Sequence, residues 1–509
     1  MQKMKIKGVL LDPARVQEKT EVYKELILLF EEWGYNTLLW HYCDDKGSAI
    51  DIPDYPDFST VNAISVADMK DIVSFAKQHS IEIIPEVECM GHTSYITKLK
   101  KYSHLRDGVE GKEFAAIAPF HPESRKIIGD LLKQTAEIFP GKYIHVGMDE
   151  TAFGNNPSTI AELAKGKKKY ELFAEHINWL NEQVTALGKK TMIWGDHLRS
   201  VAFSNMSDAL DSDSISDKIA DLISKDIIIC DWYYLNDMKP DRLDPFTKKG
   251  FQVIGCPAAS SYGMIAHPAN WNLENVRQFT KISCDNVDNG CIGVFNTVWC
   301  SGRYLTGTSL FSIAYGAMLQ NNAGEEAADF RKKFVKNTFG VQNVDEMIKA
   351  IEVLHDISVR MEILYKALPC CNDDLVECNS DETNQLKILK EEGSAVFKLL
   401  SNLKCEVSKN SKYFNDILVT AECFESIGNR FVKLKNIYRK FGISEKLTSD
   451  EINVLEQEIN EAERIYLKAV EAWNPTRYQN DPERDGVPGG GGYFVQRLCQ
   501  SLAFLKEKL

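Results

Sequence analysis

Short apolar runs alternate with amphipathic stretches along roughly the first 320 residues of the chain. Stretches such as 22–33 and 66–79 repeat apolar residues at helical spacing, and Ser65 is a suitable N-cap for the second. Apolar runs of strand length lie between such stretches, at 7–11, 37–41, 82–86, 143–147, 190–194, 227–232, 252–255 and 292–295. Eight strands separated by helices predict an α/β fold, a parallel (β/α)8 barrel of the TIM class.

The pattern changes beyond about residue 325, where strand-like runs become few. Helical spacing rich in Glu and Lys continues through 344–368, 384–403, 413–441 and 449–473. Such long periodic stretches predict an α-helical bundle. A glycine-rich loop at 485–492 and a last helix at 494–505 follow. We therefore expect a barrel catalytic domain at 1–325 and a helical domain at 326–509.

Composition and charge narrow the class of partner. The chain has 509 residues, 44% hydrophobic and 26% charged, which is typical of a globular protein with two or three domains. A net charge of −13 without a long basic run argues against nucleic acid or an anionic membrane as the partner. No apolar run has the length of a membrane span, and the N-terminus lacks the apolar core of a signal peptide. We therefore expect a cytoplasmic protein.

The cysteines point to the same compartment. The chain has 13, an odd number, and several lie in apolar strand-like segments that suit small buried thiols better than disulfides: Cys89, Cys230, Cys256 and Cys291. Cys370, Cys371 and Cys378 lie close in sequence but lack a matching second pair of ligands, so no zinc site is expected there.

The most informative candidate for chemistry is a pair of adjacent carboxylates, Asp149 and Glu150, at the end of the predicted strand 143–147. Neighbouring side chains point to opposite faces within a strand, but both can lean over one site where the backbone turns away. Two such carboxylates rarely ionise together, so one keeps a proton while the other stays charged. Cleavage of a glycosidic bond needs this pairing of proton donor and anion. The alternative is an ordinary polar loop or helix cap.

Charged and aromatic residues also follow the other predicted strands. They occur at 12–15, 41–45, 86–92, 194–197, 231–234 and 296–299. The carboxyl ends of barrel strands form one face, which is where such barrels place their active sites. Sugars stack their apolar faces on aromatic rings and offer hydroxyls to charged groups. This ring of residues therefore predicts a carbohydrate site.

These motifs resemble the family 20 glycoside hydrolases, the β-N-acetylhexosaminidases. The stretch 145–150 is similar to the family's His-x-Gly-x-Asp-Glu, 12–15 to its Asp-x-x-Arg, and 84–92 to its Pro-Glu-x-Asp-x-Pro-Gly-His. Glu88 stands where the family commonly has Asp, and Trp299-Cys300-Ser301 lacks the glutamate of the family's Trp-x-Glu. Such departures look more like the divergent hexosaminidase D-type branch. The resemblance does not extend to the C-terminal third.

The resemblance implies an exo-acting, retaining enzyme that removes terminal β-linked GlcNAc or GalNAc, without cofactor or metal. Glu150 would be the general acid and later the base. Asp149 would orient the substrate's 2-acetamido group, whose oxygen attacks the anomeric carbon and gives an oxazolinium intermediate. An anionic Asp149 is expected to raise the pKa of Glu150. The implied substrate-binding residues are Arg15, Asp44, His92, His145, Trp194, Trp232, Tyr234, Tyr262 and Trp299, with Glu88 behind them.

Three other interpretations remain open. A noncatalytic carbohydrate-binding barrel would keep the tryptophans and lose the acid, which this chain retains. A metal-dependent barrel hydrolase could use His41, Asp44, His92 and His145, although their spacing forms no compact ligand set. A third is a related enzyme for modified amino sugars.

The segment 473–493 contains residue types that make contacts, namely Trp473, Arg477, Tyr478 and Tyr493. One hypothesis is that this segment approaches the active-site mouth and shapes the aglycone site. The other is that the C-terminal helices brace the structure or form a homodimer interface.

Overall fold

The computed structural model describes residues 4–108, 116–198, 214–260, 263–321, 327–478 and 494–509. The chain divides into two compact units. The first comprises Met1–Ala258, Asn275–Val298 and Gly316–Ala323, and the second Ala259–Glu274, Trp299–Tyr315 and Gly324–Leu509. Two short stretches that precede residue 325 thus belong with the C-terminal helices. A single boundary at that residue stays a prediction.

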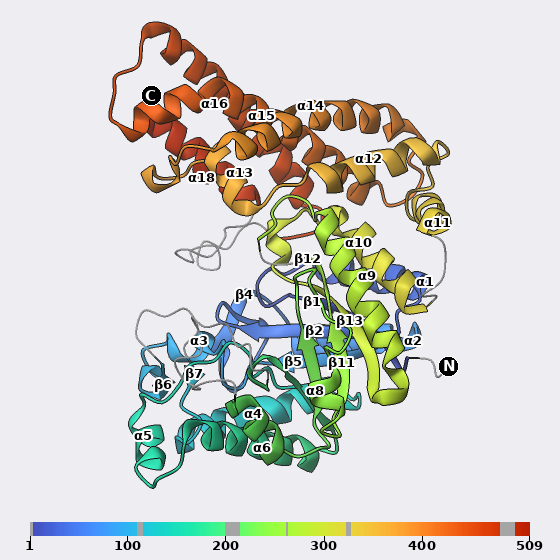
Figure 1. Ribbon diagram of the computed structural model, residues 1–509, viewed down its shortest axis with the longest axis vertical. Coiled ribbons are helices and arrows are strands. Elements are labelled where there is room, and N and C mark those ends of the chain that lie inside the picture. The colour runs from blue at the N-terminus through green and yellow to red at the C-terminus, as the bar shows by residue number, and fades with distance from the viewer. Residues whose placement is uncertain (1–3, 109–115, 199–213, 261–262, 322–326, 479–493) are drawn as a thin grey trace. The chain divides into compact units, whose positions relative to one another are not determined.

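Eight parallel strands form the barrel of the first unit (Figure 1). They are β1 (Ile6–Leu11), β2 (Thr37–Asp44), β5 (Glu82–Val87), β8 (Tyr143–His145), β9 (Lys190–Trp194), β10 (Ile228–Trp232), β11 (Gln252–Cys256) and β13 (Cys291–Val298). Each pairs with the next in this order, and β1 pairs with both β2 and β13, which closes the barrel. The predicted TIM-type fold and its eight strands are confirmed.

Eight α-helices begin within the described part of the first unit. They are α1 (Thr20–Trp33), α2 (Val66–Gln78), α3 (Ser94–Thr97), α4 (Pro122–Ile138), α5 (Pro157–Leu163), α6 (Lys169–Ala186), α7 (Ser214–Leu222) and α8 (Asp244–Thr247). The longer ones, α1, α2, α4 and α6, bury apolar residues. Ser65 caps α2 as predicted, because its side chain accepts the amide hydrogen of Asp68. Gly34 ends α1 with a left-handed φ of 92°. Two further helices, α9 (Asn270–Asp285) and α10 (Leu310–Asn321), continue from the second unit into the first.

Besides β12 (Ala258–Ser260), four short strands among the described residues lie outside the barrel order. In one extension, β3 (Gly47–Ile50) pairs antiparallel with β2, and β4 (Ser59–Ile64) pairs parallel with β3. Elsewhere β6 (Arg106–Asp107) and β7 (Ala116–Ile117) form a two-stranded antiparallel sheet.

The loop that follows the carboxylate pair is held by one buried acid. Asp107 is fully buried. Its Oδ1 accepts the amide hydrogens of Gly154, Asn155 and Asn156 at 2.7, 2.6 and 2.8 Å. Its Oδ2 accepts the hydroxyl of Thr159 at 2.5 Å. Because a buried amide without a partner is costly, this carboxylate fixes the path of the chain beyond β8.

The second unit is helical, as predicted for the C-terminal part. Its helices are α11 (Ala327–Phe339), α12 (Val344–Ile357), α13 (Met361–Ala367), α14 (Ser380–Leu403), α15 (Ser411–Gly442), α16 (Ser449–Trp473) and α18 (Phe494–Lys508). Figure 1 shows α14, α15 and α16 packed beside one another. Capping boxes at Asn379 and Thr448 begin α14 and α16. Among the described helices, none combines the length and apolar character needed to cross a bilayer.

The predicted helix 344–368 is interrupted, which the apolar spacing did not show. Ser358 is extended, and its hydroxyl donates to the carbonyl of His267 at 2.6 Å. The amide of Met361 donates to the carbonyl of Gly263 at 2.8 Å. Hydrogen bonds to this neighbouring loop replace those of a continuous helix.

The segment after α16 packs within the second unit. Arg477 is 2% exposed, lies 4.5 Å from the ring centre of Trp473 and donates to the carbonyl of Tyr304. The indole of Trp473 donates to the carbonyl of Tyr478 at 2.8 Å. These contacts support a bracing role for Trp473 and Arg477. Tyr493 and the glycine-rich loop lie outside the described residues.

We expect Asp107→Ala to lower the free energy of unfolding of the barrel unit by about 3 kcal/mol, because three backbone donors lose a charged acceptor. Thermal unfolding would show the loss, and limited proteolysis would place new cleavage near residues 154–156. Asp54 is exposed, so Asp54→Ala should leave both measurements unchanged and serves as the control. Equal stability of the two variants would contradict this account.

Candidate active site

The carboxylate pair lies where the chain leaves β8 in an unusual conformation. Gly147, Met148 and Glu150 have φ values of 68°, 86° and 42°, all in the left-handed region. For the two residues with a Cβ this costs about 1–3 kcal/mol each, which the surrounding structure must offset. The turn also explains why β8 ends two residues earlier than the predicted strand. As expected, both carboxylates face one site.

Both carboxylates face the imidazole ring of His92. Its Nε2 lies 3.3 Å from Oε2 of Glu150 and 3.8 Å from Oδ2 of Asp149. On its other side, Nδ1 lies 2.9 Å from Oδ2 of Asp45 and 3.4 Å from Oδ2 of Asp44. A buried histidine therefore links the acids after β2 with the acids after β8.

Asp44 has a different main partner, Arg15. The guanidinium of Arg15 bonds to Oδ2 of Asp44 at 2.9 Å and to Oδ2 of Asp12 at 3.1 Å. Its side chain remains 22% exposed. A guanidinium oriented by two carboxylates and still partly open can donate to the hydroxyls of a ligand.

Two glycines allow this close arrangement. A Cβ on Gly91 would lie 2.3 Å from the carbonyl oxygen of Asp149, and one on Gly147 would lie 1.9 Å from Oε2 of Glu88. The glycines of both motifs are thus required by close approach, and Gly147 also by its left-handed φ.

The charges of the cluster are interdependent. Burial lowers the pKa of His92, but the charge of Asp149 and its bonds to Asp45 and Glu150 raise it well above the usual value. Burial, followed by the charge of Glu88, raises the pKa of Asp149 well above its usual value. Burial also acts to raise the pKa of Glu150, but the bond to His92 and its charge outweigh it, so the net pKa is lowered.

This direction corrects the expectation that Asp149 raises the pKa of Glu150. His92 lies closer to Glu150 than to Asp149. Its charge stabilises the anionic form of the glutamate and so lowers the pKa of Glu150. Within the pair, the pKa of Asp149 is therefore the raised one and that of Glu150 the lowered one.

Two predicted binding residues are instead buried in the barrel interior. His145 is fully buried, and its Nδ1 accepts the amide hydrogen of Gly147 at 3.1 Å. Trp194 is 1% exposed, and its indole donates to Oε1 of Glu86 at 2.5 Å. The two rings lie 4.4 Å apart. Because neither is open to a ligand here, both support the β8 turn rather than line its surface.

Buried acids also lie behind the site, in the barrel interior. Burial, more than the charge of Glu88, raises the pKa of Glu86 to about 8. His41 bonds to Oδ1 of Asp12 at 2.7 Å and lies 3.8 Å from Oε1 of Glu88. Glu88 thus lies beside His41 in the barrel interior, and its supporting role stays a prediction.

An aromatic pair follows β10. The rings of Trp232 and Tyr234 stack with centres 5.2 Å apart, and both side chains are half-buried. Asn275 anchors this loop by donating to the carbonyls of Tyr233 and Leu235 at 3.0 and 2.9 Å. The loop therefore presents a fixed aromatic surface.

The other two predicted aromatic residues are not placed at this site. Tyr262 lies outside the described residues. Trp299 belongs to the second unit, where its amide donates to the carbonyl of Ser260 at 3.1 Å.

Several site residues were missing from the sequence-based selection, namely Asp12, Asp45, Asp196 and His197, and His41 was named only as a ligand of the metal-dependent alternative. All of them occur in the stretches at the predicted strand ends, which were selected because they are rich in charged and aromatic residues. Spacing alone did not show which member of each stretch turns inward.

Metal-ligand atoms also cluster here, in the sets Asp44, Asp45, His92 and His92, Asp149, Glu150. A metal requires neutral imidazole, whereas the acids around His92 favour its protonated form. His145, proposed for a metal site from the sequence, belongs to neither set.

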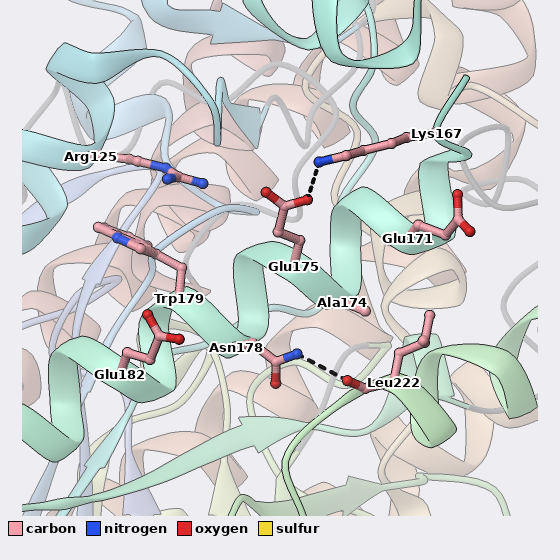
Figure 2. Close-up of a pocket in the computed structure, with 9 residues that line it drawn as sticks. All are labelled: Arg125, Lys167, Glu171, Ala174, Glu175, Asn178, Trp179, Glu182 and Leu222. Atoms are coloured by element: carbon pink, nitrogen blue, oxygen red, sulfur yellow. Dashed lines mark hydrogen bonds and ion pairs between the residues drawn. The ribbon is translucent and has the colours of Figure 1, made fainter. Parts of the chain in front are cut away.

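A separate cavity of about 580 Å³ lies along α6 and includes none of these residues (Figure 2). Its half-buried Trp179 contacts the Arg125 guanidinium at 5.1 Å from the ring centre and stacks with His176 at 5.6 Å. Lys167 and Glu175 form an ion pair of 2.6 Å across the cavity. With Trp179 in these contacts, the cavity lacks the open aromatic face that a sugar needs.

Comparison with known proteins gives consistent matches to one family. Residues 5–291 match the family described as glycosyl hydrolase family 20, catalytic domain. A β-hexosaminidase of Vibrio furnissii is 23% identical over 300 residues, which cover 52% of this chain and 45% of that protein. Hexosaminidase D of Bos taurus is 21% identical over 307 residues, which cover 56% of this chain and 84% of that protein.

Solved structures share the fold. The exo-β-N-acetylglucosaminidase of Vibrio harveyi, in complex with N-acetylglucosamine, has a TM-score of 0.50 and 20% identity. The match covers 64% of this chain and 56% of that one. This chain thus spans about half the length of the two Vibrio proteins. The family match ends before the C-terminal helices.

We expect Gly91→Ala to lower the free energy of unfolding by about 1–3 kcal/mol, because its Cβ would press on the backbone oxygen of Asp149. Gly129 in α4 provides a control, because a Cβ added there would have no atom within 4 Å. Gly129→Ala should raise stability by about 0.5–1 kcal/mol through reduced chain entropy. Chemical denaturation measures both, and a stable Gly91→Ala protein would show that the contact is not tight.

Proposed function

Because the chain belongs to glycosyl hydrolase family 20, we propose that it is a β-N-acetylhexosaminidase acting on terminal β-linked GlcNAc or GalNAc of glycans. One observation carries the proposal: two adjacent carboxylates face a single histidine at the carboxyl end of a barrel strand. A noncatalytic sugar-binding barrel has no need of such a buried and electrostatically costly arrangement.

The reaction proposed is exo-acting and retaining. The substrate's acetamido oxygen attacks the anomeric carbon while the glycosidic bond breaks and Glu150 gives its proton to the leaving oxygen. This step forms an oxazolinium ring that Asp149 stabilises through the acetamido N–H. Glu150 then takes a proton from water, whose oxygen attacks the anomeric carbon, reopens the ring and restores the acetamide. Two displacements at one carbon retain its configuration.

Substrate binding can supply the required redistribution of charge. The acetamido N–H would donate to Asp149, which stabilises the anionic form of that carboxyl and lowers its pKa. Loss of the proton from Asp149 adds negative charge next to Glu150, which favours a proton on Glu150. In this scheme the N-acetyl group both provides the nucleophile and prepares the acid.

The surrounding residues fit recognition of a sugar ring. Arg15 offers donors to ring hydroxyls, and the stacked Trp232 and Tyr234 offer an aromatic surface. The family's glutamate after the last barrel strand is absent from Trp299-Cys300-Ser301. In the family that glutamate binds sugar hydroxyls, and GlcNAc and GalNAc differ in the configuration of one hydroxyl. The choice between the two sugars is therefore left to experiment.

We expect Glu150→Gln to reduce kcat/KM on substrates with poor leaving groups by about 10²- to 10⁴-fold, because protonation of the leaving oxygen is lost. Activated aryl glycosides need less protonation and should lose much less. Steady-state kinetics on both substrates tests this, with Glu182→Gln as the control because Glu182 is exposed on α6. Equal losses on the two substrates would argue against an acid role.

The N-acetyl group should be required for catalysis itself. Aryl N-acetyl-β-glucosaminide or N-acetyl-β-galactosaminide should be hydrolysed, whereas plain β-glucosides and β-galactosides should react at negligible rates. A thiazoline mimic of the cyclised intermediate should bind much more tightly than the free sugar, and EDTA should not change the rate. Efficient cleavage of plain glycosides, or a covalent sugar trapped on Asp149 or Glu150, would refute the mechanism.

A further inference from the structure

Two consecutive backbone amides at the β8 turn are held by side chains from the end of β9. The amide of Glu150 donates to Oδ2 of Asp196 at 3.0 Å. The amide of Thr151 donates to Nε2 of His197 at 3.0 Å. The two acceptor atoms lie 3.6 Å apart, in the short 3-10 helix η3 (Asp196–Leu198).

Both side chains are committed to this task. Asp196 is 13% exposed at its side chain and His197 is 5% exposed. Asp196 Oδ1 and His197 Nδ1 have no hydrogen-bond partner among the described residues. Nε2 of His197 accepts the amide hydrogen of Thr151, so it is the ring nitrogen that serves as acceptor. Its ring also packs edge-on against Phe173, with centres 5.2 Å apart.

We refer to Asp196 and His197 together as the clamp. The peptide group between Asp149 and Glu150 is held at both its carbonyl oxygen and its N–H. The carbonyl oxygen of Asp149 lies against Gly91, where a Cβ would come within 2.3 Å. The N–H of the same peptide group points to Asp196. Together these contacts fix the plane between Asp149 and Glu150 and maintain the left-handed φ of 42° at Glu150.

We propose that Asp196 and His197 are positioning residues that set the reach of the Glu150 carboxyl for proton transfer. They act through their acceptor atoms, and the charge of Asp196 is secondary. Release of either amide lets the backbone of Glu150 relax towards an ordinary φ, which turns its side chain away from the leaving oxygen. The inference rests on the proposed hydrolysis of N-acetylhexosaminides.

Matched variants separate the acceptor from the charge and from packing. Asp196→Asn keeps a side-chain oxygen for the amide and removes the charge, whereas Asp196→Ala removes both. His197→Phe keeps a ring against Phe173 and removes the acceptor, whereas His197→Gln restores an acceptor near the position of Nε2.

The measurement is kcat and KM for two aryl N-acetyl-β-hexosaminides, one with a good and one with a poor leaving group. A misplaced acid should lower kcat on the poor leaving group by about 10²-fold in Asp196→Ala and His197→Phe. The good leaving group should lose less than about tenfold, with KM little changed, because less protonation is needed. Asp196→Asn and His197→Gln should recover most of the loss.

Several results would overturn the inference. Equal losses on both substrates, in proportion to the folded fraction seen by circular dichroism, would show that the clamp serves only folding. If Asp196→Asn lost as much kcat as Asp196→Ala, the charge of Asp196 and not its acceptor atom would be the cause. If one of the truncated variants does not fold, the other decides, since each releases a different amide. A wild-type protein that fails to hydrolyse either substrate would instead refute the proposed function.

Discussion

The placement of two carboxylates beside one buried imidazole is the constraint on which the active face of the barrel depends. Two like charges about 4 Å apart repel by about 4 kcal/mol at the effective dielectric of a protein surface, and burial makes each charge more costly. His92 offsets part of this repulsion, and the raised pKa of Asp149 reflects the rest of the cost. Asp45 in turn bonds to His92 and raises its pKa. A change in the protonation of any member therefore alters the others.

The barrel could be predicted from the sequence because its strands are buried on both faces and read as unbroken apolar runs. Helices were equally visible through their spacing, and α16 spans 449–473 as predicted. The predictions of secondary structure were wrong where tertiary contacts override the local pattern of apolar residues. At Ser358 the helix gives way to hydrogen bonds with the loop at His267, and after His145 the chain turns left-handed although its residues are apolar.

The active site was predictable in its motifs and less so in its geometry. Strand-end stretches identified Asp149, Glu150, Arg15 and His92, because barrel topology brings all such ends to one face. Sequence does not show distances between residues from different strands. It therefore left unseen that Trp194 is buried on His145, that Asp45 bonds to His92, and that Asp196 holds an amide. The direction of the Glu150 pKa depended on the same unseen distances.

One departure from the family pattern can be understood from packing and charge together. Glu88 stands where the family commonly has Asp, and its longer side chain reaches the backbone of the β8 turn, where a Cβ on Gly147 would lie 1.9 Å from Oε2. Gly147 leaves room for this carboxylate, and its left-handed φ of 68° favours glycine whatever residue stands at 88. After burial, the charge of Glu88 is the largest cause of the raised pKa of Asp149. Glu88 therefore both fills the space under the turn and adds to the effect of burial in raising the pKa of the carboxylate proposed to hold the acetamido group.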